Sequence, residues 1–258
     1  GVLEGSDIDK LFDIFKKFFW LNFAMCILQN LLFDLSGDYL GGFFGTTRGC
    51  NGYLNVFLCI ICSISISEYL ANRIKMGRVA LYFVASLYIA FLAELKVFYI
   101  EIILMAVFAV ILIKPSVKTV LLSLIFCISI FAAAIFLLVY DPGSFGVLFD
   151  MDALEWYLTG NGYTNSGDLN RFTAIQQIYK AFFKDNPFLT MFGFGLGNCE
   201  YSQFEFLQSD FSKIYGELNY RWFTHAWVFL EQGIIGLTLI VAFFVSLIVY
   251  VCNRVNTN

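Results

Sequence analysis

Long apolar runs are the feature that most constrains the fold of this chain. They approach or exceed the roughly 18 residues that a helix needs to cross a bilayer. The runs are Phe18–Phe33, Tyr53–Leu70, Val79–Ala93, Val97–Ile113, Thr119–Tyr140 and Ala226–Val251. Because the shorter alternating segments of a membrane β-barrel do not occur in the sequence, we expect an all-α, polytopic membrane helical bundle.

The composition agrees with a lipid bilayer as the main environment. Of the 258 residues, 59% are hydrophobic and only 14% are charged, and the mean hydropathy is +0.75. Soluble domains carry about a quarter charged residues. The net charge of −4 provides no basic surface, which excludes nucleic acid as a partner.

The stretch 79–113 is consistent with either one helix or two. A single helix of that length would span about 52 Å, far more than the hydrocarbon core. A break at Glu94-Leu95-Lys96 gives a hairpin and keeps most lysines and arginines on the cytosolic side, as the positive-inside rule requires. The hairpin gives six spans with both ends in the cytosol, and makes Asp34–Gly52 an external turn.

This topology divides the chain into three parts. Residues 1–139 form transmembrane helices with short loops, residues 140–225 an extracytoplasmic loop, and residues 226–258 the last span and a cytosolic tail. The loop holds half of the chain's 20 acidic residues and is too long for a passive connection. Within it, Asn170–Phe183 has apolar residues at helical spacing (Phe172, Ile175, Ile178, Tyr179 and Phe182), which predicts an amphipathic helix at the membrane surface. We expect the active site in this loop, among short helices.

Several charged residues lie at the predicted external face or inside a span. They are Arg48, Glu94, Lys96, Glu101, Arg171, Arg221 and Glu231. Charges at membrane depth are costly and usually serve function, and four cations around one cavity would bind a pyrophosphate. The alternative is that the arginines contact lipid headgroups, that Lys96 extends to the interface, and that Glu94 pairs with it.

His225, the only histidine of the chain, lies at the start of the last apolar run. Imidazole is the side chain best suited to accept a proton near neutral pH, which makes His225 the candidate catalytic base. Alternatively it anchors the helix at the interface, as we expect of its neighbours Trp222 and Trp227. Glu231 lies roughly 9 Å further along the helix and on a different face, so we expect it to support packing or a neighbouring cation.

Two glycine clusters carry further predictions. Gly193, Gly195 and Gly197 permit left-handed dihedrals and backbone amides that face an anion or a sugar, or they form a plain tight turn. They do not meet the nucleotide-binding fingerprint, because no βαβ unit surrounds them. Gly233 and Gly236 predict close packing of the last helix against a neighbour.

Metal and redox signals in the sequence are weak. Asp150-Met-Asp152 is similar to the aspartate pair with which sugar-nucleotide transferases hold a divalent metal, but two aspartates alone do not make a site. Cys59 and Cys62 lie inside an apolar run and predict packed or lipid-facing thiols, and a disulfide between Cys50 and Cys199 is not expected. The sequence thus predicts no metal and no cofactor.

Four segments, taken in order, resemble the O-antigen ligase and O-antigen polymerase superfamily. They are Gly41–Asn55, Ala93–Lys96, Arg171–Asn198 and Thr224–Gly236. The most recognisable features are the arginine-led helix, the Asn-Pro pair, the glycine-rich turn, and the ending with His followed by Glu-x-Gly-x-x-Gly. The resemblance covers roughly residues 10–255 and implies a GT-C-like bundle of which this chain is the C-terminal half.

The resemblance implies a metal-independent, inverting glycosyltransferase of the bacterial inner membrane, with its active site facing the periplasm or the cell exterior. It would polymerise undecaprenyl-pyrophosphate-linked oligosaccharides into O-antigen, capsule or exopolysaccharide, with a glycan or lipid-linked acceptor and a chain-length regulator as partners. His225 matches the residue taken to activate the acceptor hydroxyl, and Arg171 one that holds the donor pyrophosphate. Lys96 stands where many members have arginine, so it keeps the charge but loses bidentate phosphate geometry. Arg48 and Arg221 are weaker matches.

Two other functions stay open. A ligase that transfers finished glycan to an acceptor would use the same chemistry, although Glu-Leu-Lys in place of a serine-arginine pair favours the polymerase. A transporter or flippase for lipid-linked glycans would bind the same pyrophosphate without a proton acceptor. It would place its site near the midplane between repeated halves, and no internal repeat is visible.

Overall fold

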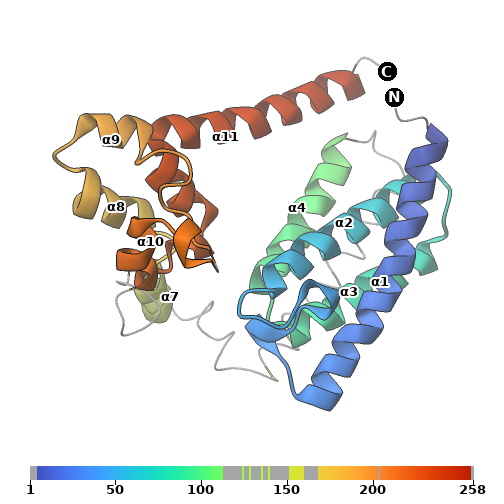
Figure 1. Ribbon diagram of the computed structural model, residues 1–258. Coiled ribbons are helices and arrows are strands. Elements are labelled where there is room, and N and C mark those ends of the chain that lie inside the picture. Colours follow the sequence, from blue (N-terminus) through green and yellow to red (C-terminus); the bar gives the residue numbers. More distant parts are fainter. Residues whose placement is uncertain are drawn as a thin grey trace. The chain divides into compact units, whose positions relative to one another are not determined.

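The computed structural model describes residues 5–112, 151–159, 168–202 and 204–256, with the single positions 124, 128, 135 and 139. All secondary structure in these ranges is helical, as predicted (Figure 1). The chain divides into two compact units, Gly1–Ile135 and Phe136–Asn258. The predicted span Thr119–Tyr140, apart from the single positions within it, lies outside the described residues.

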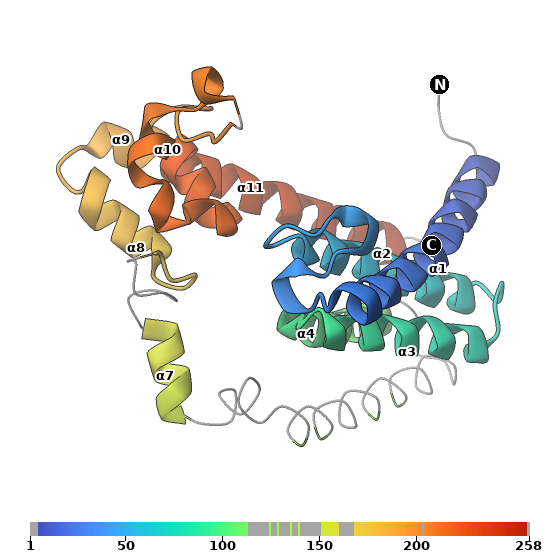
Figure 2. The same ribbon diagram turned by 60° about the horizontal axis from the view of Figure 1, so that its bottom comes forward.

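The part of the first unit that the structure describes contains four long helices. They are α1 (Gly5–Phe33), α2 (Asn51–Leu70), α3 (Met76–Leu92) and α4 (Lys96–Leu112). α2 packs against the other three helices, and Figures 1 and 2 show the group from two directions. The small residues Ala85, Ser86 and Ala90 are buried on α3, where they permit close helix packing.

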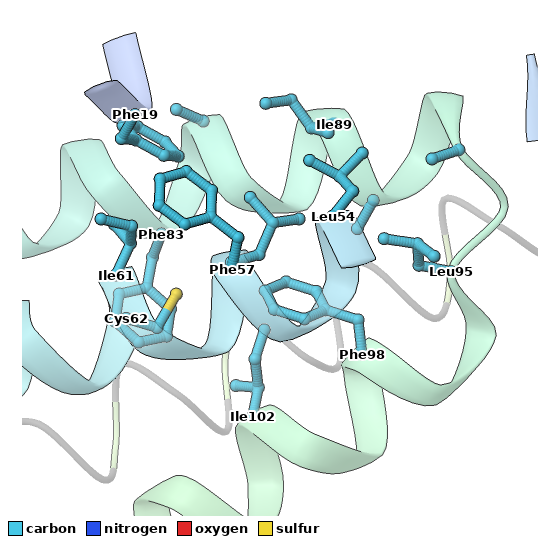
Figure 3. Close-up of a cluster of buried hydrophobic side chains, with 14 of the residues drawn as sticks. Phe19, Leu54, Phe57, Ile61, Cys62, Phe83, Ile89, Leu95, Phe98 and Ile102 are labelled. Atoms are coloured by element: carbon cyan, nitrogen blue, oxygen red, sulfur yellow. The ribbon is translucent and has the colours of Figure 1, made fainter. Parts of the chain in front are cut away.

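Side chains from all four helices meet in the core of the first unit (Figure 3). Phe19 of α1, Leu54 of α2, Ile89 of α3 and Phe98 of α4 are fully buried there. Cys62 is also fully buried among them. Of the two predicted environments for this thiol, the structure therefore shows the packed one.

The predicted break between α3 and α4 is confirmed, at Ala93–Leu95. Glu94 has a left-handed backbone with a φ of 52°. The Leu95 amide donates to the Ala90 carbonyl oxygen at 2.8 Å, and the Glu94 amide donates to the Phe91 carbonyl oxygen at 3.1 Å. These two bonds form the Schellman motif that ends helices, here without its usual glycine.

The loop between α1 and α2 folds back along α1. It contains two short helices, η1 (Gly37–Tyr39) and η2 (Gly42–Phe44). The Gln29 side-chain amide donates to the Gly42 carbonyl oxygen at 2.9 Å and accepts from the Gly42 amide at 2.8 Å. In addition, Asn22 Oδ1 accepts from the Phe43 amide at 2.7 Å.

These hydrogen bonds explain why the first predicted span carries polar residues. Asn22 lies about 16 Å before the end of α1, counted along the helix. The loop therefore re-enters the unit to that depth, and the side-chain amides of α1 satisfy backbone groups that would otherwise be buried without partners. The central part of the predicted turn Asp34–Gly52 is thus a loop that re-enters the unit, a re-entrant loop, and its position outside the membrane stays a prediction.

The second unit consists mainly of short helices around the first part of a long one. Its elements are α7 (Met151–Thr159), α8 (Ala174–Ile178), the π-helical η4 (Tyr179–Phe183), α9 (Pro187–Phe192), η5 (Glu205–Leu207), α10 (Asp210–Tyr215), η6 (Gly216–Leu218), η7 (Tyr220–Trp222) and α11 (Thr224–Asn256). Aromatic side chains dominate its core, for example Phe183 and Phe229, whose ring centroids lie 5.1 Å apart. Asn186 caps α9 by accepting from the Phe188 and Leu189 amides at 3.1 and 3.2 Å.

A helix forms where the loop sequence predicts one, but it buries another face. α8 and η4 bury Ala174, Ile178 and Phe183, because the π-helical turn inserts an extra residue into the repeat. The predicted face shares only Ile178 with this set. Its other members are half-buried or exposed, namely Phe172, Ile175, Tyr179 and Phe182. The predicted apolar face is therefore largely turned away from the unit's own core, and its contact with a membrane surface stays a prediction.

α11 bends at Gly233, where φ is 62° and ψ is −157° (Figure 1). Before the bend the helix packs into the second unit, with Ala226 and Leu230 fully buried. After the bend its large apolar side chains are exposed over 239–251. The predicted span Ala226–Val251 thus contains a bend at Gly233, with a first part that is buried within the protein and a second part that is exposed.

Two glycines let α11 meet the end of α9 backbone to backbone. A Cβ on Gly233 would lie 2.5 Å from the Met191 carbonyl carbon, and a Cβ on Gly193 would lie 2.4 Å from that of Glu231. The predicted packing role of Gly233 is confirmed. At Gly236 the neighbouring atoms belong instead to Gln232, a residue of the same helix.

Two helices in the described part of the chain are long and apolar enough to cross a membrane. They are Asn51–Leu70 and Thr224–Asn253. The most apolar window of the first is 56% buried within the protein, whereas that of the second is only 6% buried. The second helix is therefore long and apolar enough to lie in a bilayer, with most of its surface available for lipid contact. The six-span arrangement stays a prediction.

Candidate functional site

His225 lies in the first turn of α11, beside the chain that leads into α8. Its Nε2 atom is 2.8 Å from the carbonyl oxygen of Arg171. Its ring stacks on Phe223, with centroids 6.0 Å apart and planes inclined by 25°. Phe223 is only 5% exposed, so it forms a fixed support for the partly exposed imidazole.

Arg171 is held against the same aromatic ring. Its guanidinium carbon lies 5.4 Å from the Phe223 ring centroid, within the range of a cation–π contact. The preceding residues are anchored: the Leu169 amide donates to the Leu218 carbonyl oxygen at 2.9 Å, and the buried Asn170 accepts from the Phe172 amide. Phe223 thus carries the candidate base and one candidate cation together.

The contact with Arg171 fixes the tautomer of neutral His225. A carbonyl oxygen can only accept a hydrogen bond, so Nε2 must carry the proton. The lone pair of the neutral imidazole then lies on Nδ1. The same carbonyl oxygen can accept from Nε2 whether or not Nδ1 carries a proton, so the ring keeps its orientation. This arrangement suits a general base.

Arg221 has a different aromatic partner. Its guanidinium carbon lies 4.6 Å from the centroid of the Tyr201 ring, and the residue is exposed. A guanidinium that stacks on a ring keeps its N–H edge directed away from the ring, where it can bind an anion. Arg221 therefore keeps the chemistry that the sequence assigns to it.

The glycine turn has the predicted dihedrals but not the predicted free amides. Gly193, Gly195 and Gly197 have φ values of 69°, 98° and 80°. The Phe194 amide donates to the Leu230 carbonyl oxygen at 2.7 Å, and the Gly195 amide donates to that of Glu231 at 2.9 Å. Further amides of the turn bond within the protein in the same way, those of Gly193, Asn198, Cys199 and Glu200. Of the two predicted roles, these bonds favour the tight turn, here bound to α11, and a contact of the three glycines with substrate stays a prediction.

Glu231 lies behind this turn and is 5% exposed. Its Oε1 accepts from the Cys199 amide at 3.1 Å, and the Tyr220 hydroxyl donates to the Cys199 carbonyl oxygen at 2.7 Å. Burial, together with the Glu231 charge, raises the pKa of the Cys199 thiol to about 12. Burial also raises the pKa of Tyr220. These groups connect the turn, η7 and α11 into one block beneath His225.

The other predicted site residues lie together at one end of the first unit. Arg48 pairs with Asp38 at 3.6 Å, and the Asn51 side-chain amide donates both to Asp38 Oδ1 at 3.3 Å and to the Ala93 carbonyl oxygen at 3.1 Å. Glu94 follows Ala93 directly, and Lys96 is the first residue of α4. Arg48, Glu94 and Lys96 are all exposed. The convergence of the four cations on one cavity stays a prediction.

Glu101 is tied to α2 rather than to a cation. Its Oε2 accepts from the Asn55 amide at 2.8 Å and from the Cys59 thiol at 3.1 Å. These bonds satisfy the carboxylate of α4 within the helix pair. Glu101 therefore joins helices, as polar groups within membrane bundles do.

Metal ligands do not gather in the part of the chain that the structure describes. No group of three or more His, Cys, Asp or Glu side chains there could hold a metal ion. Asp152 lies in α7, while its partner Asp150 lies outside the described residues. Cys50 and Cys199 are both free thiols.

Phe223 is the residue of this group that sequence reasoning missed. It carries both Arg171 and His225, but the chain is 19% aromatic, so one more phenylalanine gave no signal. No family model, curated protein or solved structure matches the chain. The family resemblance therefore stays a prediction that rests on the quoted segments.

Proposed function

We propose that this protein polymerises undecaprenyl-pyrophosphate-linked oligosaccharide repeat units into a surface polysaccharide by metal-independent, inverting glycosyl transfer. The observation that carries the proposal is the group formed by Arg171, Phe223 and His225. It places an oriented imidazole and a guanidinium on one aromatic ring. A base for a hydroxyl proton and a cation for a pyrophosphate are the two groups that this reaction needs.

In the proposed reaction, an acceptor hydroxyl oxygen attacks C1 of the donor sugar. The new C1–O bond forms as the bond from C1 to the pyrophosphate oxygen breaks, and that oxygen keeps the electron pair. The hydroxyl proton passes to Nδ1 of His225 and later to solvent. Arg171, with Lys96, Arg48 and Arg221 as further candidate contacts, stabilises the negative charge that develops on the pyrophosphate.

The position of His225 suits a donor whose tail lies in lipid. The exposed apolar part of α11 begins after Gly233, about 12 Å along the helix from His225. If the exposed part of α11 lies in the bilayer, a sugar-pyrophosphate just outside the hydrocarbon core would lie near His225. Its polyprenyl tail would remain in the core. We propose accordingly that the protein is a multi-pass inner-membrane protein with six spans and that this group faces the periplasm or the cell exterior.

The test replaces His225 by alanine in the full-length protein and measures surface-polysaccharide chain length, with the membrane level checked by immunoblot. Loss of a general base costs about 10²–10⁴-fold in rate, so long chains should disappear while single lipid-linked units accumulate outside the membrane. Glu217→Gln, an exposed change outside the group, should leave chain length unchanged.

A second variant tests the guanidinium of Arg171 separately from its backbone carbonyl. Arg171→Ala keeps the backbone carbonyl that orients His225 and removes only the guanidinium, so it should slow polymerisation about 100-fold without loss of the protein. Activity of purified protein in EDTA tests metal independence. Persistence of long chains in His225→Ala would refute the proposal and make His225 an interface anchor. Accumulation of units on the cytosolic side would favour the flippase.

A further inference from the structure

An open surface pocket of about 460 Å³, called the cavity below, lies in the second unit. It is lined by Phe194, Asn198, Gln208, Ser209, Asp210 and Phe211. None of these residues belongs to the Arg171, Phe223 and His225 group. The volume falls within the roughly 300–1,000 Å³ of small-molecule sites.

The floor of this cavity is aromatic. The rings of Phe194 and Phe211 are half-buried, with centroids 5.2 Å apart and planes inclined by 43°. Phe211 rests in turn on Tyr220, at 5.5 Å between centroids, and Tyr220 is 1% exposed. The two rings therefore cannot collapse into the cavity without displacing a buried core.

The glycine turn accounts for the position of Phe194. This residue lies between Gly193 and Gly195, which both have positive φ, and its amide is bound to the Leu230 carbonyl oxygen. The turn thus fixes the backbone on both sides of one aromatic side chain. The Phe194 and Gly195 amides are bonded to α11 and do not bind a ligand. We infer that the Gly-x-Gly pattern serves instead to position the Phe194 side chain.

The rim of the cavity is polar and rich in acceptors. Asn198 donates its amide to the Phe194 carbonyl oxygen, and Gln208 donates its own to Ser212 Oγ at 3.4 Å, so both amide oxygens remain as acceptors. The Asp210 side chain is 95% exposed, and it approaches Lys213 only at 3.7 Å. Carboxylate and amide groups side by side can bind neighbouring hydroxyls of one pyranose ring.

The charge of the lining distinguishes among ligands. Among the described residues, no lysine or arginine lines the cavity, and its one charged lining residue, Asp210, is exposed and paired with Lys213 at 3.7 Å. The lining therefore offers no cation of its own to bind a pyrophosphate or a uronic acid. The C–H face of a neutral sugar is instead attracted to the negatively polarised face of a phenylalanine ring, while its hydroxyls donate to the rim.

We propose that this cavity is a saccharide subsite for neutral or N-acetylated sugar units, with Phe194 and Phe211 as the stacking surface and Asn198, Gln208 and Asp210 as hydroxyl acceptors. The assignment deepens the proposed function, on which it rests for the source of the saccharide. It places a sugar of the lipid-linked chain in the subsite, while the pyrophosphate contacts cations elsewhere.

The experiment measures binding of free oligosaccharides to the purified full-length protein in nanodiscs. The probes are fragments of one to three repeats cut from each surface polysaccharide of the host cell, without lipid or pyrophosphate. Isothermal titration and saturation-transfer NMR report the affinity and the sugar protons that lie on the rings. Wild-type protein should bind fragments built from neutral sugars, with protons of one pyranose face giving the strongest signal.

Substitutions in the rim should weaken this binding. Asp210→Ala and Asn198→Ala should each weaken it roughly tenfold, the effect of one lost hydrogen bond to a strong acceptor. Because the Asp210 side chain is almost fully exposed, its removal leaves the fold intact. Glu205→Ala, an exposed acid of the preceding turn that does not line the cavity, is the matched control and should bind like wild type.

The outcomes separate this subsite from the proposed function. Equal binding by wild type and His225→Ala, with loss in Asp210→Ala, supports the subsite even if polymerisation turns out not to need His225. Absence of binding by every fragment, or wild-type affinity in both rim variants, overturns the subsite even if His225→Ala abolishes long chains.

Discussion

Each unit contains a glycine-rich turn folded against a helix, and the two turns are held by different groups. In the first unit, the side-chain amides of Gln29 and Asn22 bind the backbone of Gly42 and Phe43. A side chain of α1 thus stands between the turn and the helix backbone. In the second unit, the turn meets the backbone of α11 directly.

The bend in α11 makes the second arrangement possible. A break at Gly233 leaves the last carbonyl groups of the preceding helical segment without their usual partners. The Phe194 and Gly195 amides bind two of these groups, the carbonyl oxygens of Leu230 and Glu231. The bend and the glycine turn therefore depend on each other. A side-chain contact can rotate away from a new methyl group, whereas a backbone contact cannot.

The largest effect should follow Gly193→Ala. A Cβ there would lie 2.4 Å from the Glu231 carbonyl carbon, and the φ of 69° with a ψ of −167° is a conformation that only glycine adopts readily. Strain and overpacking together should lower the free energy of unfolding by about 3–5 kcal/mol. Thermal unfolding of the purified protein, followed by size-exclusion fluorescence, measures this loss.

Gly197→Ala is the matched control for this substitution. Gly197 also has a positive φ, 80°, but no atom lies within 4 Å of a Cβ placed there. Gly197→Ala should therefore lower the free energy of unfolding only by the cost of the strained dihedral, about 1–2 kcal/mol. If both variants melt at the same temperature, the turn is not packed on the α11 backbone.

A smaller effect should follow Gly42→Ala, and a second substitution should relieve part of it. A Cβ on Gly42 would lie 2.3 Å from Asn22 Oδ1, the end of a side chain that can rotate. The positive φ of 62° and the displaced Asn22 hydrogen bond together should lower the free energy of unfolding by about 2–3 kcal/mol. Adding Asn22→Ala removes the closest contact and leaves Cys26 Sγ, at 2.8 Å from the new Cβ, as the nearest atom, so the double variant should be more stable than the sum of the two single losses predicts.

The coupling in this double-mutant cycle should be about 1–2 kcal/mol. Gly49→Ala, with a φ of 87° and no atom within 4 Å of its Cβ, isolates the cost of the dihedral in the first unit. Gly193→Ala has no such suppressor, because its neighbour is backbone. Strictly additive costs at Gly42 and Asn22 would show that the side chain does not hold the re-entrant loop.

The parts of the fold that the sequence predicts are those set by local pattern. The apolar runs mark α2, α3 and α4 closely, and the charged tip at Glu94 marks the break between the last two. Left-handed dihedrals at Gly193, Gly195 and Gly197 follow from the residue type. In each case the cause lies within a few residues of the effect.

The parts that the sequence did not predict depend on distant partners. The re-entrant loop requires Gln29 and Gly42 to meet, and the bend at Gly233 requires the turn that follows α9. The residues that α8 and η4 bury within the unit do not follow a 3.6-residue repeat, because a π-helical turn interrupts it. In the candidate site, Arg171 and His225 stood out as charged or titratable residues, but their shared contact with Phe223 is tertiary.

The smallest effect concerns the two thiols next to these turns. Burial raises the pKa of both Cys50 and Cys199, and the Glu231 charge contributes at Cys199, whose pKa reaches about 12. A raised pKa keeps the thiol neutral as pH increases through 9, so the thiolate fraction of Cys199 between pH 8 and 9 should be ~1000-fold below that of an unfolded thiol. Any stability linked to this group is present below pH 9 and is lost as pH rises from 9 towards 12.

Alkylation by iodoacetamide at pH 8.5, with the two cysteine peptides quantified by mass spectrometry, compares the two turns directly. Cys199 should react more slowly than Cys50, and both should react equally fast after unfolding in detergent at high temperature. Glu231→Gln keeps an acceptor for the Cys199 amide and removes the charge, so it should increase the labelling of Cys199 and leave Cys50 unchanged. Equal labelling of both cysteines in the folded protein would mean that the backbone-held turn opens as readily as the side-chain-held one, which would remove the distinction between them.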